Sequence, residues 1–345
     1  MSFADRVVAW QKVRGRNDLP WQNTRDPYRV WLSEIMLQQT QVVTVKAYFT
    51  RFLERFADVQ SLAGASLDEV LGLWSGLGYY SRARNLHQCA KVVVQKHGGK
   101  FPRDAQTLST LPGIGRSTAS AISSLCFGER VAILDANVKR VVTRTQGFDA
   151  DLAVSSHEKL LWELATELLP VIGTSARDMA RYTQGMMDLG ATVCVPKRPR
   201  CAVCPVSADC AAHRDQDPER YPVRSRKLKR SSQRIFLLLA QNPDGDVWLS
   251  RRPAPGVWAG LYCPPLFDSD EAMCTALTAA QRALLVPSEA FKHVLSHKDL
   301  HLHPRLLGVS KDDDFGDQGR WVSATEWPGL GLPAPIRRLL ESRAL

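Results

Sequence analysis

The chain lacks any apolar run long enough to span a bilayer, and its N-terminus lacks the pattern of a secretory signal. These two absences argue against the membrane-spanning classes and lead us to expect a cytoplasmic protein. The chain also shows no strand-like alternation of polar and apolar residues before residue 230. Its first two-thirds is therefore expected to be entirely α-helical.

Acidic residues are comparatively few. The 45 Lys and Arg residues outnumber the 35 Asp and Glu residues, which gives a net charge of +10 and a pI near 9.3. This imbalance favours a polyanionic partner, with nucleic acid as the first candidate. The 345 residues, of which 44% are hydrophobic, are enough for two domains with a real core.

A glycine turn, LPGIG, lies at residues 111–115 between two expected helices. One helix runs from about 104 to 109 and the other begins near Arg116. Gly113 and Gly115 allow the backbone to turn sharply and to approach a ligand closely. The unpaired N–H groups at the start of the following helix then suit a DNA phosphate. The alternative is an ordinary helix–helix connection.

An apolar run further along the chain delivers Asp135, with Asn137 close behind it. A carboxylate that follows apolar residues and opens a helix is held rigidly and is partly desolvated. Asp135 is therefore a candidate catalytic group, although a helix N-cap is the common alternative role for such an Asp.

A second candidate acid lies near the N-terminus. Residues 1–15 are expected to form an amphipathic helix, Arg16 and Trp21 lie in the loop after it, and a long helical stretch is expected from about 26 to 56. Glu34 lies among the apolar residues of this stretch. It is either a solvated surface acid or a buried acid with a raised pKa. Gln39 belongs to the polar run QQTQ at the end of that segment.

A second glycine turn, GLGYY, ends a helix that opens with the capping box SLDE at 66–69. Leu77 lies between the two glycines and Tyr79 follows them, an arrangement that could push side chains into a base stack. The alternative is a helix C-cap with core aromatic residues. Further helices are expected at 81–97, 137–147, 156–169 and 174–190.

Half of the eight cysteines form a cluster with the spacing C-x6-C-x2-C-x5-C. Four thiols this close require a metal centre, and composition alone leaves zinc and an iron–sulfur cluster open. The four are Cys194, Cys201, Cys204 and Cys210. The others are expected to be inert thiols in the core or at the surface: Cys89, Cys126, Cys263 and Cys274.

Residues 217–232 contain two prolines and a basic run that includes Arg226, Lys227 and Lys229, which indicates a linker. The pattern then changes. Strands are expected near 234–240, 247–250, 291–310 and 320–322, and helices near 270–284 and 333–343. This pattern is typical of a small α+β domain.

Several motifs together carry a resemblance to a known family. They are WLSEIMLQQTQV, GLGYYSRARNLH, LPGIGRSTA, ILDANVKRV, MMDLGATVC and the four-cysteine spacing. The chain resembles the MutY-type adenine DNA glycosylases of the helix–hairpin–helix superfamily, which includes endonuclease III. The resemblance implies an all-α glycosylase region at 1–216 with a [4Fe–4S] loop at 194–210, a basic linker at 217–232, and a Nudix-like lesion-recognition domain at 233–345.

The resemblance also assigns roles to residues. The acid at Glu34 would protonate adenine at N7, and Asp135 would stabilise the sugar cation, with Asn137 orienting the site. Extrusion of the base leaves a gap in the stack, which wedge residues would fill. The expected contacts to the base are Gln184, Trp21 and Arg16. The expected wedges are Gln39 and Tyr79, and Leu77 is a further expected contact.

Some positions distinguish this chain from its relatives. Endonuclease III-like enzymes have a Lys at position 117, whose amine forms a Schiff base and cleaves the strand. This chain has Ser117, which predicts a monofunctional glycosylase. Phe127 replaces the Tyr of some relatives. Leu295 replaces a Phe before Ser296 and His297, the pair expected to meet 8-oxoguanine.

The expected function is therefore excision of adenine from double-stranded DNA where it is mispaired with 8-oxoguanine or guanine. We expect a monomer, nucleoid-associated in the cytoplasm, with no membrane partner. Three alternatives remain: an oxidised-pyrimidine glycosylase/lyase of the endonuclease III type, a non-catalytic DNA-binding protein, and a nucleotide pyrophosphatase. Ser117 argues against the glycosylase/lyase. The presence of both Glu34 and Asp135 argues against a non-catalytic protein. The lack of an acidic Nudix array after Gly260 argues against a pyrophosphatase.

Overall fold

The computed structural model describes residues 1–345 except 23, 226–229, 317 and 343–345, so Arg226, Lys227 and Lys229 of the basic linker lie outside the described residues. The chain divides into two compact units. The first, called here the helical unit, comprises Met1–Gly64 and Asn85–Lys227. The second, called the sheet unit, comprises Ala65–Arg84 and Leu228–Leu345. The turn GLGYY thus groups with the C-terminal residues.

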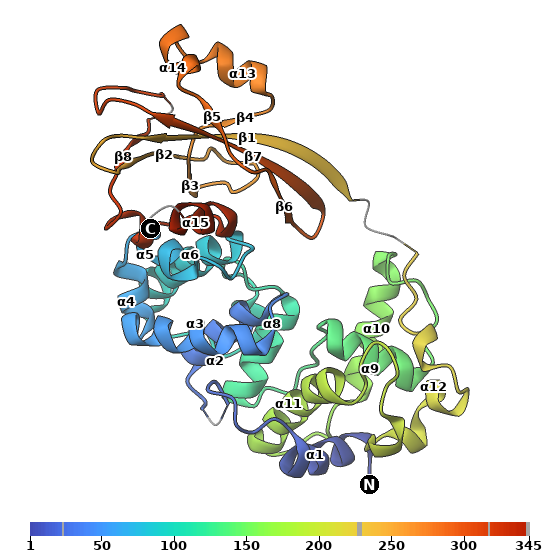
Figure 1. Cartoon of the computed structure of the whole chain (residues 1–345). Coiled ribbons are helices and arrows are strands. Elements are labelled where there is room, and N and C mark those ends of the chain that lie inside the picture. Colours follow the sequence, from blue (N-terminus) through green and yellow to red (C-terminus); the bar gives the residue numbers. More distant parts are fainter. Residues whose placement is uncertain (23, 226–229, 317, 343–345) are drawn as a thin grey trace. The chain divides into compact units, whose positions relative to one another are not determined.

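Every regular element of the described helical unit is a helix (Figure 1), as the sequence predicted. Asp26 caps the second helix with a hydrogen bond from the Tyr28 backbone N–H, and Pro27 occupies its first turn, where its missing N–H costs nothing. The α-helices are α1 (Phe3–Arg14), α2 (Pro27–Leu37), α3 (Val42–Arg55), α4 (Val59–Gly64), α6 (Ser81–His97, shared with the sheet unit), α7 (Ala105–Leu108), α8 (Arg116–Ile122), α9 (Ala136–Gln146), α10 (Ser155–Glu167), α11 (Ala176–Thr192) and α12 (Ala211–Arg214).

The long helical stretch expected from 26 to 56 is wrong in one respect, because it is broken between α2 and α3. Residues 38–41 form a turn, and Gln39 has a φ of 57°, a left-handed conformation that no helix accommodates. The polar run QQTQ offers no apolar side chain to continue the buried stripe. The sequence did not indicate this break, because apolar residues recur at helical spacing on both sides of it.

One core of the helical unit is built from α1, α9, α10 and α11. Val7, Val141, Leu161 and Leu189 lie fully buried in it. Gly185 on α11 lets α1 approach closely, since a Cβ there would lie 2.8 Å from a methyl group of Val7. This packing fixes α9, which carries Asp135 at its N-terminus.

The expected helix from about 104 to 109, the turn after it and the helix beginning near Arg116 are present as α7, a turn and α8. α8 continues without interruption into a π-helix at Ser123–Phe127, which ends at Gly128 with a φ of 74°. Short π-helical segments frequently mark functional sites. This one is anchored to α11 by a buried 2.6 Å hydrogen bond between the hydroxyls of Ser124 and Thr183.

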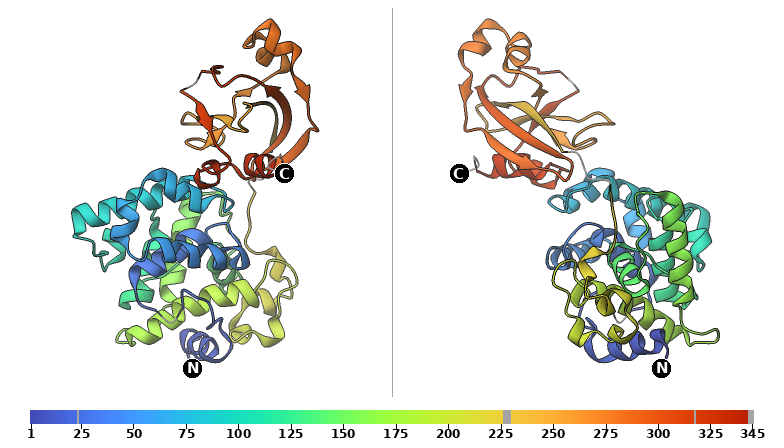
Figure 2. Two further views of the ribbon diagram at one scale, coloured as in Figure 1. Left: turned by 60° about the vertical axis from the view of Figure 1, so that its left-hand side comes forward. Right: turned by 90° about the vertical axis from the view of Figure 1, so that its right-hand side faces the viewer.

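The sheet unit contains a mixed sheet (Figure 1 and Figure 2). Its strands pair in the order β3-β2-β1-β7-β5. β1 and β7 run parallel and pair from Ser231↔Lys298 to Gln241↔Gly308, and the other pairs are antiparallel. The strands are β1 (Ser231–Gln241), β2 (Val247–Arg251), β3 (Tyr262–Cys263), β4 (Leu266–Phe267), β5 (Val286–Pro287), β6 (Phe291–Val294), β7 (Lys298–Gly308) and β8 (Arg320–Val322).

Helices cover both faces of this sheet. One core joins Leu237, Leu302 and Ile336 of α15 (Ala334–Glu341), and the other joins Leu238 to Met273 of α13 (Asp270–Thr275). The single helix expected at 270–284 is wrong, because Thr278 forms a capping box that starts a separate α14 (Ala279–Ala283). The fold class expected from the sequence is confirmed.

The fragment 65–84 is bound to the C-terminal residues by specific contacts. α5 (Leu67–Trp74) has Ser66 as its N-cap, and a Cβ on Gly72 would lie 2.2 Å from the carbonyl oxygen of Gly329. The Ser75 hydroxyl donates to the Leu332 carbonyl at 3.0 Å.

In the described part of the chain, no helix is long and apolar enough to cross a membrane.

Candidate functional site

Glu34 lies in the middle of α2, and the residues beside it, Ser33, Ile35 and Met36, are buried. Glu34 itself is half-buried. Burial and, to a smaller extent, the charge of Asp135 together raise the pKa of Glu34 from its ordinary 4.5 to about 7. Of the two readings that the sequence left open, the structure favours a buried acid that keeps its proton near neutral pH.

Asp135 is the N-cap of α9, and its Oδ1 accepts the backbone N–H of Val138 at 2.7 Å. Its other oxygen accepts from Nδ2 of Asn137 at 3.3 Å. Burial raises the pKa of Asp135, while these two donors and the charge of Arg140 favour the anion. Asp135 is therefore a helix N-cap, as the alternative role required. The cap uses only one of its carboxylate oxygens, and the other oxygen is free to accept from Asn137.

Ser117 joins the hairpin to the segment that carries Asp135. Its hydroxyl oxygen accepts the backbone N–H of Leu134 at 3.0 Å. The side chain at position 117 therefore lies beside the residue that precedes Asp135.

A cavity of about 360 Å³ in the helical unit is lined by Trp21 and Gln184. Trp21 is buried and meets Phe49 edge-on with ring centroids 5.4 Å apart. Leu125 of the π-helix lines the same cavity. Trp21 and Gln184, two candidates for contact with the base, thus line the same cavity although they are far apart in the sequence. Other lining residues are Gln11, Asn17, Gln22, Thr24, Arg25, Val30, Arg177, Ala180 and Arg181.

Arg16 is not free to line this cavity. Its Nε donates to Oδ1 of Asp188 at 2.8 Å and its backbone N–H donates to Oδ2 at 3.0 Å. Gln184 also donates to Oδ1 of Asp188, at 2.9 Å. Burial raises the pKa of Asp188, and the Arg16 charge opposes this shift. Asp188 therefore orients Gln184, a role that the sequence indicated only by its place in MMDLG.

The two wedge candidates share a strained backbone. Gln39 has a φ of 57° and Tyr79 a φ of 48°, although neither is a glycine. Such conformations persist only where the surroundings enforce them, and they cluster at functional sites. Both side chains are exposed, and Tyr79 retains 40% of its surface. Leu77, by contrast, is buried, so its side chain does not project from the turn.

The glycines of the hairpin differ in what they leave open. Gly113 has a φ of 75°, and a Cβ there would lie 2.7 Å from the Cβ of Asn85. At Gly115, the N-cap of α8, a Cβ would meet no protein atom within 4 Å. Only Gly113 is therefore needed for the fold itself, and Gly115 leaves free space in front of the helix.

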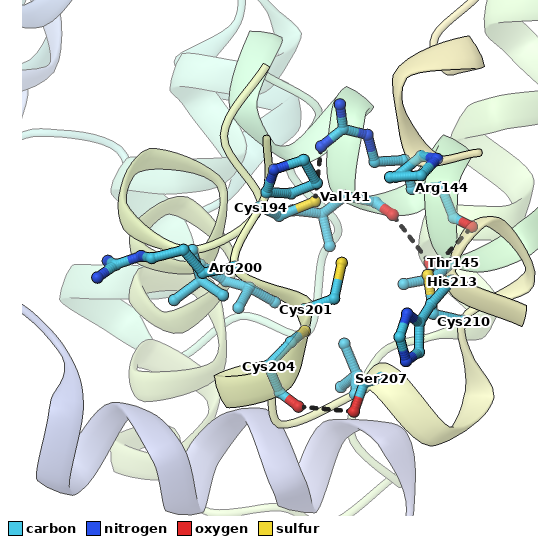
Figure 3. Close-up of a pocket in the computed structure, with 15 residues that line it drawn as sticks. Val141, Arg144, Thr145, Cys194, Arg200, Cys201, Cys204, Ser207, Cys210 and His213 are labelled. Carbon is cyan, nitrogen blue, oxygen red and sulfur yellow. Dashed lines mark hydrogen bonds between the residues drawn. The ribbon is translucent and has the colours of Figure 1, made fainter. Parts of the chain in front are cut away.

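The four clustered cysteines line a single cavity, with Cys194, Cys201, Cys204 and Cys210 drawn around it in Figure 3. All four are free thiols. The rest of the lining is largely apolar and includes Val141, Leu189, Val193, Pro199, Val206 and Pro218. No set of three or more His, Cys, Asp or Glu side chains in the described residues is arranged to hold a single metal ion.

Two buried arginines of α9 bind the segment around the first of these cysteines. Arg140 donates to the Cys194 carbonyl at 2.7 Å and to Oδ1 of Asn137 at 3.0 Å. Arg144 donates to the Cys194 sulfur at 3.4 Å and to the Val195 carbonyl at 2.7 Å. A guanidinium beside a sulfur suits a thiolate.

The sheet unit has its own cavity, of about 470 Å³, lined by Tyr79, Leu295, Ser296 and His297. The hydroxyl groups of Tyr79 and Ser296 form a hydrogen bond. Residues from the GLGYY turn and from the β6–β7 hairpin thus meet in one site. Sequence reasoning missed two aromatic members of this lining, Trp258 and His293, whose rings lie 6.4 Å apart.

Comparison with known proteins identifies the family. Residues 32–167 match the family described as HhH-GPD superfamily base excision DNA repair protein, and residues 236–342 match the NUDIX domain. The adenine DNA glycosylase of Buchnera aphidicola subsp. Acyrthosiphon pisum (strain APS) is 36% identical over 345 residues, covering 99% of this chain and 97% of that protein. The chain belongs to the adenine DNA glycosylase family.

Other proteins similar to this chain agree with this family assignment. The adenine DNA glycosylase of Homo sapiens is 43% identical over 230 residues, covering 63% of this chain and 40% of that protein. The solved structure of a thermostable thymine-DNA glycosylase is 32% identical with a TM-score of 0.54, covering 62% of this chain and 95% of that one. A non-covalent endonuclease III–DNA complex, 21% identical with a TM-score of 0.50 and covering 62% and 94%, shares the fold.

Membership of the adenine DNA glycosylase family makes the chain a DNA glycosylase of base excision repair, a hydrolase of N-glycosyl bonds. The resemblance drawn from the sequence motifs is confirmed. The signal for Asp188 and Arg140 was available inside two of those motifs, MMDLG and NVKRV. The sequence alone indicated no role for Trp258.

Proposed function

We propose that this glycosylase excises adenine mispaired with 8-oxoguanine or guanine in double-stranded DNA, as a monofunctional enzyme and a monomer. The observation that carries the proposal is the pair Glu34 and Asp135, one acid with a pKa of about 7 beside one held by N–H donors. This is the division of labour that N-glycoside hydrolysis needs: an acid for the base and an anion for the sugar.

In the proposed reaction Glu34 gives its proton to N7 of the extruded adenine. The bond between N9 and C1′ then breaks with its electron pair on the base, which leaves a cationic sugar. Asp135 stabilises that cation through its charge, and Asn137 fixes the orientation of the carboxylate. Water adds to C1′ and loses a proton to a carboxylate of the site, which completes the hydrolysis. Trp21 and Gln184 would hold the base, with Gln184 oriented by Asp188.

Ser117 supports the monofunctional assignment. A serine hydroxyl cannot form an imine with the sugar, and here it is engaged by the Leu134 backbone N–H. The product is therefore an intact strand with an abasic site. Gln39 and Tyr79 are the proposed wedges, and the cavity with Ser296 and His297 is the proposed reader of 8-oxoguanine. Gly113 and Gly115 would face a phosphate.

We further propose that Cys194, Cys201, Cys204 and Cys210 hold a [4Fe–4S] cluster. Four free, half-buried thiols around one cavity, with a guanidinium at the Cys194 sulfur, fit the thiolate ligands of such a centre. The cluster would supply a covalent cross-link for the loop 194–210. We divide the chain as 1–216, 217–232 and 233–345, and place it with chromosomal DNA in the cytoplasm.

The deciding experiment is incubation with duplexes that carry adenine opposite 8-oxoguanine, adenine opposite guanine, or thymine glycol, each analysed with and without alkali. We expect adenine release from the first two, with breakage only after alkali. Release of thymine glycol with direct strand cleavage would instead identify the oxidised-pyrimidine glycosylase/lyase.

A further inference from the structure

The first residue of α8 is held in a way that the chemistry of base excision does not require. Arg116 is exposed, and its guanidinium carbon lies 3.9 Å from the centre of the Trp162 ring on α10. This is the shortest of the cation–ring distances among the described residues. Trp162 itself is buried in the core of the helical unit, so the platform is rigid.

Stacking leaves the donors of Arg116 unused. Within the described residues, no carboxylate lies in salt-bridge range of its guanidinium and no acceptor lies in hydrogen-bond range. A ring face attracts the charge without accepting any N–H, so the donors at the edge of the planar group stay available. A fixed guanidinium with free edge donors matches the geometry of a phosphate.

A second cation that contacts α10, Lys139 of α9, is held differently. Nζ of Lys139 donates to Oε1 of Glu158 at 2.7 Å, and Glu158 lies one turn before Trp162 on α10. The charge of Lys139 is thus neutralised within the protein, whereas that of Arg116 faces only a ring. α10 therefore fixes two cations and leaves one of them for an external anion.

We propose that Arg116 binds a DNA phosphate beside the hairpin and that Trp162 is the positioning residue that holds it there. Gly115, exposed and with open space around its Cα, directly precedes Arg116, so both face the same stretch of a DNA backbone. The contact carries no base information and acts on every duplex alike. The inference rests on the proposed binding of DNA, but not on which base is excised.

The test compares Arg116→Gln with Arg51→Gln. Arg51 is a matched control, because it is also exposed and stacked, 4.5 Å from the centre of the Tyr48 ring within α3. Dissociation constants are measured for matched and mismatched duplexes over a series of salt concentrations. Arg116→Gln should weaken all duplexes by about tenfold or more at low salt. It should also reduce the slope of log K against log[salt] by about 0.9. Arg51→Gln should change neither.

The role of Trp162 is tested by two substitutions, with melting temperatures as a check on folding. Trp162→Phe keeps a ring face and should keep the wild-type salt slope. Trp162→Leu should reproduce the slope of Arg116→Gln, and the double variant should lose no more. An unchanged slope in Arg116→Gln overturns the proposal, and additive losses overturn the positioning role.

The same set of proteins separates this proposal from the function proposed above. At saturating enzyme, Arg116→Gln should release adenine at the wild-type single-turnover rate, since it acts on binding. A large loss of that rate would place Arg116 in the chemistry and contradict the phosphate contact. If wild type released no adenine but still showed the slope difference, the proposed function would fail and the contact would stand.

Discussion

Glu34→Gln should make the protein inactive and, at alkaline pH, more stable. The fold raises the pKa of Glu34 from 4.5 to about 7, so the folded state favours the neutral acid. Below the unfolded pKa the carboxyl is neutral in both states and costs nothing. As the pH rises toward and through 7, ionisation progressively destabilises the fold, by about 3 kcal/mol at the alkaline limit.

The assay is urea unfolding at several pH values. The gain of Glu34→Gln over wild type should grow from about 1 kcal/mol at pH ~5.5 to about 3 kcal/mol at pH ~9. Glu54→Gln, at an exposed position on α3, is the control and should show no such growth. A gain that is the same at both pH values would refute the reasoning, because it would mean that Glu34 is solvated.

Excision should respond in the opposite sense. An amide cannot protonate the base, so the single-turnover rate of Glu34→Gln should fall by about 10²–10⁴-fold while DNA binding persists. In wild type the same rate should decline as the pH rises above about 7, because the protonated fraction of Glu34 declines. A flat profile between pH ~6 and ~9 would exclude Glu34 as the proton donor.

Three other predictions follow from single sites. Ser117→Lys should introduce an amine beside Asp135, so strand cleavage and borohydride trapping should appear; their absence would remove position 117 from the sugar. Gly115→Val should weaken binding to matched and mismatched duplexes alike without lowering the melting temperature, since a Cβ there meets no protein atom. Ser296→Ala combined with His297→Ala should reduce the preference for 8-oxoguanine over guanine opposite adenine, measured as a ratio of excision rates; an unchanged ratio would give this cavity another role.

The sequence predicted most helices because their start signals are local. Asp104, Ser66 and Asp135 each cap the helix that the sequence led us to expect, through a hydrogen bond from a backbone N–H within three residues. The break at 38–41 was missed because apolar periodicity resumes in α3 and the left-handed Gln39 leaves no mark in composition. A φ above zero at a non-glycine residue depends on tertiary surroundings.

The candidate site was predictable in its residue types but not in its pairings. The motif around Glu34 indicated an acid among apolar residues. The structure adds that burial and the charge of Asp135 raise its pKa. The ion pair between Arg16 and Asp188 could not be predicted, because it depends on α11 lying against the loop after α1. The grouping of the GLGYY turn with the C-terminal residues is likewise a long-range fact, carried by contacts such as Ser75 to Leu332.

α9 explains why a cysteine loop can matter to chemistry that it does not touch. Asp135 caps the start of this helix, and the next turns carry Arg140 and Arg144, which donate to carbonyl groups of Cys194 and Val195. Arg144 is only 2% exposed, so loss of the loop would leave a buried guanidinium without its partners at the Val195 and Pro196 carbonyls. Arg140 would meanwhile lose one of the anchors from which it holds Asn137 against Asp135. The loop and the proposed catalytic carboxylate of Asp135 are therefore stabilised through the same helix, and disorder in one should loosen the other.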